Sequence, residues 1–486
     1  RDDVMTRDLT LGAIRRALQE LIVHFPVYRT YISAKGRSAA DDKVFQQAME
    51  GARSTLNEGD WPVLDHLEQW LGGQPWRNRP VGRARKMLKH ACVRFQQLTS
   101  PAAAKAVEDT AFYRSAVLLS RNDVGFSTEQ FSAPLADFHA ANQQRLKTFP
   151  GNLLATATHD HKRGEDTRAR LAVLSECAPW YAEQVEQWRR LAEPLRESAD
   201  SPSAGDELIL YQVLLGSWPL EPNPDLEAYQ QRLWQWQQKA LREAKLQSSW
   251  SAPNEAYEKA VEAFLKRLLL SEAGAPLRSA LDSAAQAIAP AGALNGLAQT
   301  LLHLTVPGVP DIYQGDEFWD FSLVDPDNRR PVDFAARQRA LQAPPDIGEL
   351  LFNWRDGRIK QAVIAQVLGL RKACPELLRH GSYTPLEVVG QHAERVVAFY
   401  REHQGKQLLV VVPRWSYPLL ENGMFPQINA QVWGDTRVKL PFAAPAQNWK
   451  GLFQTGVVTP NKELLISAAL GDLPVNVFIN PDNQES

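Results

Sequence analysis

The sequence has few cysteines, little net charge and no long apolar run, and each shortage excludes a class of protein. The three cysteines, Cys92, Cys177 and Cys374, lie far apart without a CxxC pair. This spacing argues against a disulfide framework or a zinc knuckle and predicts a reducing, cytoplasmic setting. No apolar run reaches the ~18 residues of a membrane-spanning helix. Lys and Arg number 54 and Asp and Glu 56, so we expect no nucleic-acid partner and no membrane partner, and a neutral substrate is favoured.

The remaining composition is typical of a large globular protein. The chain has 486 residues, of which 44% are hydrophobic and 23% charged. This length predicts about two to four domains. The 14 Trp residues supply broad aromatic faces that suit sugar rings, although most Trp side chains fill cores.

The spacing of apolar residues changes along the chain from helical to alternating. Helical spacing predicts helices at 9–24, 40–100, 128–147, 164 to about 305, and 356–373. We expect breaks in the second of these near 59–62 and 72–80, and breaks in the fourth that include 289–292. Short runs of β-branched and aromatic residues predict strands at 25–32, 153–158 and within 306–317. Alternation past residue 380 predicts a small β-sandwich with strands at 395–400, 407–413, 437–442, 463–470 and 473–480.

The richest polar cluster, THDHKRGED at 158–166, lies at the end of one predicted strand. Strands that alternate with helices indicate a parallel sheet, and α/β barrels place their active sites at the carboxyl ends of such strands. Asp160 is the candidate carboxylate, because it would supply negative charge beside a developing sugar cation. His159 and Lys162 could donate hydrogen bonds to sugar hydroxyls.

Two other interpretations of this cluster stay open. Alternate residues on an extended segment can converge on an ion. A metal site would then use His159, His161, Glu165 and Asp166. We nevertheless expect no metal. Alternatively, Glu165 and Asp166 open a helix, because acids are favoured in a first helical turn. We adopt the helix interpretation for these two acids.

Two further polar segments are ambiguous when each is taken alone. EDTAFYR at 108–114 combines two acids, an aromatic pair and an arginine, and it is compatible with a helix end that carries a local Asp–Arg pair. DPDNRRP at 325–331 is typical of a turn-rich loop followed by a helix that starts at Pro331.

Taken together, four segments resemble the maltooligosyltrehalose synthases, a family of the α-amylase superfamily (glycoside hydrolase family 13). They are FPVYRTYI (25–32), FQQLTSPAAAKAVEDTAFYR (95–114), LLATATHDHKRGEDTRARLAVLSE (153–176) and TVPGVPDIYQGDEFWDFSLVDPDNRRPVDF (305–334). The resemblance covers the chain from about residue 8 to the end. The HDxKRGEDxRAR segment is specific to this family, whereas PGVPDIYQGDE and DPDNRRP alone indicate only the superfamily.

The resemblance implies an α/β fold: the C-terminal part of a (β/α)₈ barrel, strands six to eight, with large α-helical insertions and a C-terminal antiparallel β-sandwich. The implied domains are 1–34 (strand six), 35–94 (helical insertion), 95–175 (strand seven and the polar cluster), 176–288 (helical insertion), 289–378 (strand eight and the last helix) and 379–486 (β-sandwich).

The resemblance also implies an isomerase that acts on maltooligosaccharides or other α-1,4-glucans without a cofactor. It would convert the reducing-end α-1,4 bond to an α,α-1,1 bond by intramolecular transglucosylation, with an aspartate nucleophile, a glutamate acid/base and a second, stabilising aspartate. Asp160 matches the stabilising aspartate and His159 the sugar-contacting histidine. The other matches are Lys162 and Arg163 near the acceptor subsites, Glu108, Asp109, Tyr113 and Arg114 on the reducing-end side, and Tyr313, Asp316, Asp325, Asn328 and Arg329 after strand eight. His161 stands where the family commonly has Thr.

Segments that match the nucleophile and the acid of the superfamily are missing from this sequence. We therefore expect an N-terminal fragment or chain of the same enzyme as a partner that carries both groups. Two alternatives remain: another α-glucan hydrolase or transferase of the superfamily, and a non-catalytic glucan-binding subunit.

Overall fold

The computed structural model describes residues 6, 8–198, 200–420, 424–441, 448–460 and 462–480. By its internal contacts the chain divides into two compact units, Arg1–Tyr113 and Arg114–Ser486. None of the helices in the described part of the chain combines the length and the apolar composition that a membrane crossing requires.

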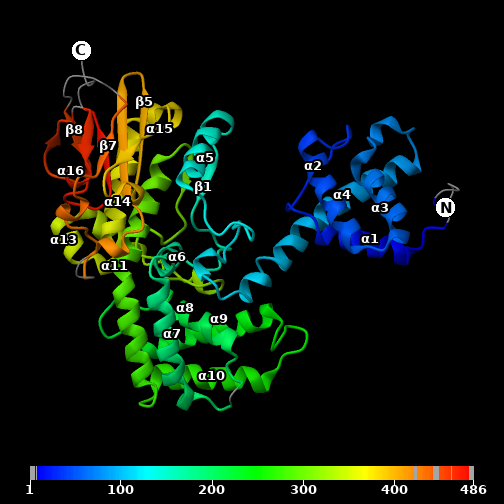
Figure 1. Ribbon diagram of the computed structural model, residues 1–486, viewed down its shortest axis with the longest axis horizontal. Helices are drawn as coiled ribbons and strands as arrows, with labels where there is room; N and C mark the ends of the chain where they lie inside the picture. The colour runs from blue at the N-terminus through cyan, green and yellow to red at the C-terminus, as the bar shows by residue number, and fades with distance from the viewer. Residues whose placement is uncertain are drawn as a thin grey trace. The chain divides into compact units, whose positions relative to one another are not determined.

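The first unit is helical, as its apolar spacing predicts (Figure 1). Its helices are α1 (Leu11–Val23), α2 (Ala39–Thr55), α3 (Trp61–Glu68) and α4 (Arg83–Ala106). Hydroxyl side chains start two of them: Thr10 accepts from the backbone of Ala13, and Ser38 forms a capping box with Asp41. The apolar faces meet in a core that includes Leu21, Phe45 and Leu64, all almost fully buried.

The predicted strand at 25–32 is wrong. Residues 6 and 8–113 contain no strand, and Tyr31 within the segment is 75% exposed. A strand needs a neighbouring backbone as its hydrogen-bond partner. Here side chains take that place: the backbone N–H of Ile32 donates to Gln96 Oε1 at 2.7 Å, and that of Tyr31 donates to Asp41 Oδ1 at 3.3 Å.

The second unit begins with helices that surround a short parallel sheet. Its helices before the β-rich part are α5 (Leu135–Thr148), α6 (Glu165–Ala172), α7 (Ala178–Ala192), α8 (Ala204–Ser217), α9 (Leu226–Ala244), α10 (Glu255–Leu270), α11 (Ala275–Thr305), α12 (Phe334–Gln342), α13 (Ile347–Phe352), α14 (Arg358–Ala373) and α15 (Pro375–His380). Strands β1 (Leu153–Ala155) and β2 (Val309–Asp311) pair in parallel, with Leu153 opposite Val309. The predicted parallel pairing of these two segments is therefore confirmed, and their carboxyl ends share one edge.

The predicted helix break at 289–292 is wrong, because α11 continues through Pro290. A proline inside a helix costs about 3 kcal/mol or more. Around Pro290, however, α11 is buried on all sides: Ala289 and Ala291 are at most 1% exposed. A β-carbon added at Gly292 would lie 2.7 Å from Arg170 Cα, so α6 packs directly against this turn. Close packing of this kind offsets the cost of the proline.

The C-terminal part contains two antiparallel sheets. Its elements are β3 (Thr384–Pro385), β4 (Val388–Val389), β5 (Val396–His403), β6 (Lys406–Pro413), β7 (Arg437–Lys439), β8 (Trp449–Gly451), β9 (Val457–Val458), β10 (Glu463–Leu465), α16 (Ile466–Ala469) and β11 (Asn476–Ile479). One sheet has the order β3-β5-β6-β11-β8-β9 and the other β10-β7-β4. Both sheets supply side chains to one apolar cluster, among them Val411, Phe478 and Val438.

The five predicted strands of this part are confirmed with changed bounds: β5 and β6 are longer than predicted, and β7, β10 and β11 are shorter. The strand predicted at 463–470 ends at Leu465, where the chain enters α16. The backbone N–H of Ile466 donates to Thr436 O, and that of Leu470 then donates to Ile466 O. The last residue of the strand predicted at 437–442 lies outside the described residues.

Candidate active site

The loop between β1 and α6 carries the polar cluster at the carboxyl edge of the parallel sheet. His159 and Asp160 are exposed on this loop, whereas Lys162 and Arg163 are buried. The backbone N–H of Asp160 donates to Thr158 Oγ1 at 3.1 Å. The structure therefore leaves the Asp160 carboxylate accessible, as contact with a substrate requires.

A second carboxylate, from Asp123, holds the buried half of this loop. Asp123 follows the 3₁₀ turn Leu119–Arg121 and is 3% exposed. Its Oδ1 accepts from the backbone N–H of Lys162 at 3.0 Å, and its Oδ2 accepts from that of Arg163 at 3.1 Å. Arg168 Nε lies 3.4 Å from the same carboxylate. The sequence analysis missed Asp123, because a single aspartate in a loop carries no spacing signal.

The buried basic side chain of Arg163 supports the loop from within. Its Nη1 donates to Asn122 O at 3.0 Å, and its backbone forms a bridge with Leu323. Contact of Lys162 and Arg163 with a substrate stays a prediction.

The first turn of α6 is fixed by a buried lysine that the sequence analysis also missed. Lys360, on α14, is 0% exposed, and its Nζ lies 2.5 Å from Glu165 Oε1 and 2.6 Å from Asp166 Oδ2. Burial alone would lower the pKa of Lys360, but the two carboxylates raise it above its usual value. Burial raises the pKa of Asp166 to about 6.

These ion pairs engage two of the four side chains that the metal interpretation needs. Glu165 and Asp166 do open a helix, as expected, and their carboxylates turn toward Lys360. In the part of the chain that the structure describes, no group of three or more His, Cys, Asp and Glu side chains is arranged to hold a metal ion.

Two residues of the segment after β2 reach the β1–α6 loop. Asn328 Nδ2 donates to the carbonyl of His159 at 2.9 Å, and the Tyr313 hydroxyl donates to Asn328 O at 3.2 Å. The Tyr313 ring lies edge-on to His161, with ring centroids 5.9 Å apart. Tyr313 and Asn328 are 15 residues apart in the sequence, and the structure brings Asn328 to His159, which lies 169 residues before it.

Asp325 and Arg329 lie further along the same segment. Lys239, on α9, approaches Asp325 Oδ1 at 2.7 Å, and Arg329 lies 3.9 Å from the same carboxylate. Burial opposes ionisation of Asp325, but the hydrogen bond from Lys239 and its charge keep the pKa below its usual value. The helical insertion therefore contributes a cation to this side of the site.

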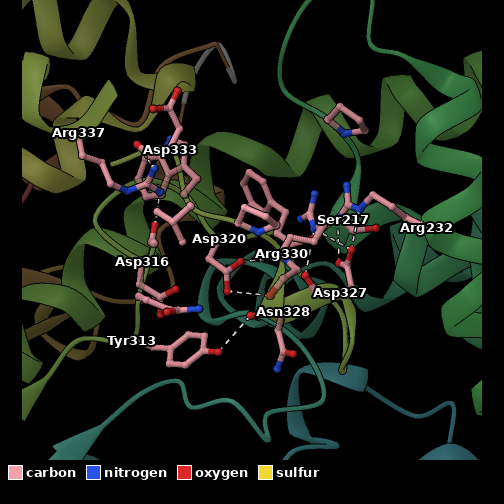
Figure 2. Close-up of a pocket in the computed structure, with 18 of the residues that line it drawn as sticks. Ser217, Arg232, Tyr313, Asp316, Asp320, Asp327, Asn328, Arg330, Asp333 and Arg337 are labelled. Atoms are coloured by element: carbon pink, nitrogen blue, oxygen red, sulfur yellow. Dashed lines mark hydrogen bonds and ion pairs between the residues drawn. The ribbon is translucent and has the colours of Figure 1, made fainter. Parts of the chain in front are cut away.

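A cavity of about 300 Å³ opens beside these residues (Figure 2). The segment after β2 forms most of its wall, and Arg232 on α9 holds Asp327 there through contacts of 2.9 and 3.0 Å. Asp316 is 2% exposed, and burial raises its pKa well above the usual value. Tyr313, Asp316 and Asn328 all line the cavity. Asp160 is not among the lining residues.

The EDTAFYR segment spans the boundary between the two units. Glu108, Asp109 and Tyr113 belong to the first unit and Arg114 to the second. Within the first unit Glu108 accepts from the Tyr28 hydroxyl, and Asp109 pairs with Lys105 at 2.8 Å. Within the second, Arg114 Nε donates to Ala244 O at 2.6 Å. The placement of these four residues beside a substrate stays a prediction.

Comparison with known proteins gives a consistent set of relatives. No protein-family model matches the sequence. Two Mycobacterium tuberculosis proteins, provisionally named maltooligosyl trehalose synthase, are 38% identical to the chain over 390 residues, which is 80% of this chain and 45% of theirs. The chain spans about half the length of these curated relatives.

Solved structures agree with these relatives. A mutant of maltooligosyltrehalose synthase from Arthrobacter ramosus matches with a TM-score of 0.76 and 29% identity, over 98% of this chain and 55% of the other. A hypothetical maltooligosyl trehalose synthase from Sulfolobus tokodaii matches with a TM-score of 0.69 and 26% identity, over 95% and 53%.

Proposed function

The chain is a homologue of maltooligosyltrehalose synthases that spans about half of their length, and on this basis we propose that it carries one catalytic carboxylate of such an enzyme. In this proposal an N-terminal portion of the same enzyme supplies the nucleophile and the acid/base. The parallel pair of β1 and β2 belongs to a (β/α)₈ barrel that this portion completes, and the two C-terminal sheets form a β-sandwich.

The proposed reaction moves one glycosidic bond within a maltooligosaccharide. The α-1,4 bond to the reducing-end glucose breaks, with the proton for the leaving oxygen supplied by the acid/base, and a covalent glycosyl-enzyme forms. The released glucose turns round, and its anomeric hydroxyl attacks the intermediate and returns its proton to the acid/base. The product ends in an α,α-1,1 bond and has no reducing end.

Within this reaction Asp160 stabilises the positive charge that develops on the sugar ring. The observation that carries this role is the exposure of Asp160 on a loop whose neighbouring residues are held by buried contacts. His159 would donate a hydrogen bond to a sugar hydroxyl, and the hydrogen bond from Asn328 to its carbonyl supports this role. Tyr313 and Asp316 line the adjoining cavity, where they would contact the substrate.

Asp160→Asn in the complete enzyme tests the proposal. Loss of the negative charge is expected to lower kcat by roughly 10²–10³-fold while the fold is kept. Turnover is measured as the disappearance of reducing ends from maltooligosaccharides. Asp137→Asn, which changes an exposed carboxylate in the first turn of α5, is the matched control and should leave turnover unchanged.

Product analysis separates the alternatives. An increase in reducing ends would indicate a hydrolase of the same superfamily. Calorimetric binding of maltooligosaccharide without turnover by the complete assembly would indicate a glucan-binding subunit. Near-normal kcat in Asp160→Asn would refute the catalytic role of Asp160.

A further inference from the structure

We propose that Asp123 is a positioning residue for this reaction, acting through Asp160. The inference rests on the proposed function, since it assumes that the Asp160 carboxylate acts on the substrate. Asp123 itself is buried and touches no reacting atom. Its role would be to fix the backbone on which Asp160 is carried.

The geometry of the Asp123 carboxylate supports this role. Its two oxygens accept from two successive backbone N–H groups, those of Lys162 and Arg163, at 3.0 and 3.1 Å. Oδ1 also accepts from the N–H of Val124 at 2.7 Å. Hydrogen bonds from N–H donors to a carboxylate are short and roughly twice as strong as neutral ones. The two successive peptide groups on either side of the Lys162 α-carbon are therefore held by one rigid carboxylate.

Asp123 works with other contacts along the loop, which include the hydrogen bond between His161 Nε2 and Ser322 Oγ at 3.1 Å. Before Asp160, the carbonyl of His159 accepts from Asn328 at 2.9 Å. After Arg163, the N–H of Gly164 donates to Ser322 O at 2.8 Å. Only His161 separates Asp160 from Lys162, the first residue whose N–H Asp123 accepts.

The close packing at Gly164 limits the alternatives open to the loop. A β-carbon at this position would clash with Asp320, so the loop packs closely against Asp320 at its carboxyl end. If Asp123 is lost, we expect the loop to shift on the side away from this contact, which carries Asp160. A displacement of about 1 Å in a catalytic group can cost about 10²-fold in rate.

Arg168 supports Asp123 in turn. Its Nε donates to Arg163 O at 3.1 Å and lies 3.4 Å from Asp123 Oδ2. The guanidinium thus balances the buried negative charge and binds the same loop. This arrangement places a positive charge beside the carboxylate that accepts from both N–H groups.

A double-mutant cycle in the complete enzyme tests the inference. Asp123→Asn keeps the shape and one carbonyl acceptor, and we expect kcat to fall about 10–100-fold with KM changed less than about threefold. In the Asp160→Asn background, Asp123→Asn should lower kcat by less than about twofold, because the carboxylate it positions is already absent. Multiplicative effects of the two substitutions, or a normal kcat in Asp123→Asn, would overturn the inference.

A matched variant separates positioning from a loss of stability. Asp225 caps α9 by accepting from the N–H of Ala228 at 3.0 Å, away from the β1–α6 loop. Asp225→Ala removes this cap and should reduce stability by about 1 kcal/mol without changing kcat. If both variants lower kcat in proportion to their loss of melting temperature, Asp123 is merely structural.

Amide hydrogen exchange on this chain gives a readout that does not need activity. In Asp123→Asn the N–H groups of Lys162 and Arg163 should exchange faster, while those of α11 keep their protection. Unchanged exchange at Lys162 and Arg163 would overturn the inference. A normal kcat in Asp160→Asn would instead refute the proposed function, so the two failures are distinguishable.

Discussion

At the scale of single residues, Lys360 shows how a buried charge organises this site. One ammonium group contacts the carboxylates of Glu165 and Asp166 and also donates to Phe318 O at 3.3 Å. It therefore joins α14, the start of α6 and the segment after β2. Two carboxylates without this cation would be buried side by side, which is strongly unfavourable.

Lys360→Met is therefore expected to destabilise the chain by about 3–5 kcal/mol at neutral pH, because it leaves two buried carboxylates unpaired. The free energy of unfolding from urea denaturation measures the effect. Lys372→Met, which removes an exposed lysine from the same helix, should change that free energy by less than about 0.5 kcal/mol. Equal effects of the two substitutions would contradict the assigned role.

The candidate site is predictable from the sequence only in part. The HDHKR segment places Asp160 and His159 at the end of a strand, because polar residues directly after an apolar run mark that position. Asp123 and Lys360 give no such signal. They come from a distant loop and a distant helix, and their importance depends on a packing arrangement that no local pattern encodes.

At the scale of elements, a single arginine caps the ends of two helices. Arg401, on β5, is 0% exposed. Its Nη1 donates to Thr305 O, the last residue of α11, and to Leu378 O in α15, both at 3.0 Å, and its Nη2 donates to Gly381 O at 3.0 Å. Carbonyls at helix C-termini lack partners within the helix, and cations are favoured there. Burial lowers the pKa of Arg401 to about 10. The guanidinium therefore stays charged at neutral pH.

Arg401→Met should destabilise the chain by at least about 3 kcal/mol, because three buried carbonyls lose a charged donor at once. The comparison variant is Arg437→Met, on β7, whose exposed ion pair with Glu463 at 2.7 Å is worth less than about 1 kcal/mol. Differential scanning calorimetry on both variants measures the difference. A loss as small for Arg401→Met as for Arg437→Met would show that the helix ends do not need this guanidinium.

The sequence predicts an element correctly where one face of the segment packs against the core. The prediction fails where contacts with residues distant in the sequence determine the secondary structure. The spacing of Leu11, Leu18 and Leu21 is sufficient to predict α1. The segment 25–32 has strand-like composition, but among the described residues of the first unit there is no strand to pair with it. Pro290 predicts a helix break, yet burial of the surrounding alanines against α6 keeps α11 continuous.

At the scale of the whole molecule, Glu176 links the helices of the second unit to its β-rich part. Its Oε2 accepts from the backbone N–H of Tyr417 at 3.0 Å. Burial raises the pKa of Glu176 to about 7, and the nearby Arg395 and Arg414 only partly oppose this. The usual pKa of 4.5 applies to the unfolded chain. The folded state thus binds this proton more tightly, and the contribution of Glu176 to stability is lost as the pH rises from about 4.5 through about 7.

Glu176→Gln should remove this pH dependence, because the amide stays neutral like the protonated acid. Relative to the variant, the wild-type chain should lose at most about 3 kcal/mol of stability between pH 5 and pH 8. The difference in melting temperature between the two proteins, measured at both pH values, tests this. A difference that does not change with pH would show that Glu176 titrates normally.

The parallel pairing of β1 with β2 also constrains the order in which the second unit folds. Between the two strands the chain forms all the helices from α6 to α11, whose hydrogen bonds are local. The strands share only three residue pairs, and closing so long a loop before those helices have formed is entropically unfavourable. We therefore expect the helices to form first and to bring the strand ends together. Closure of this loop is then the step that brings Asn328 to His159.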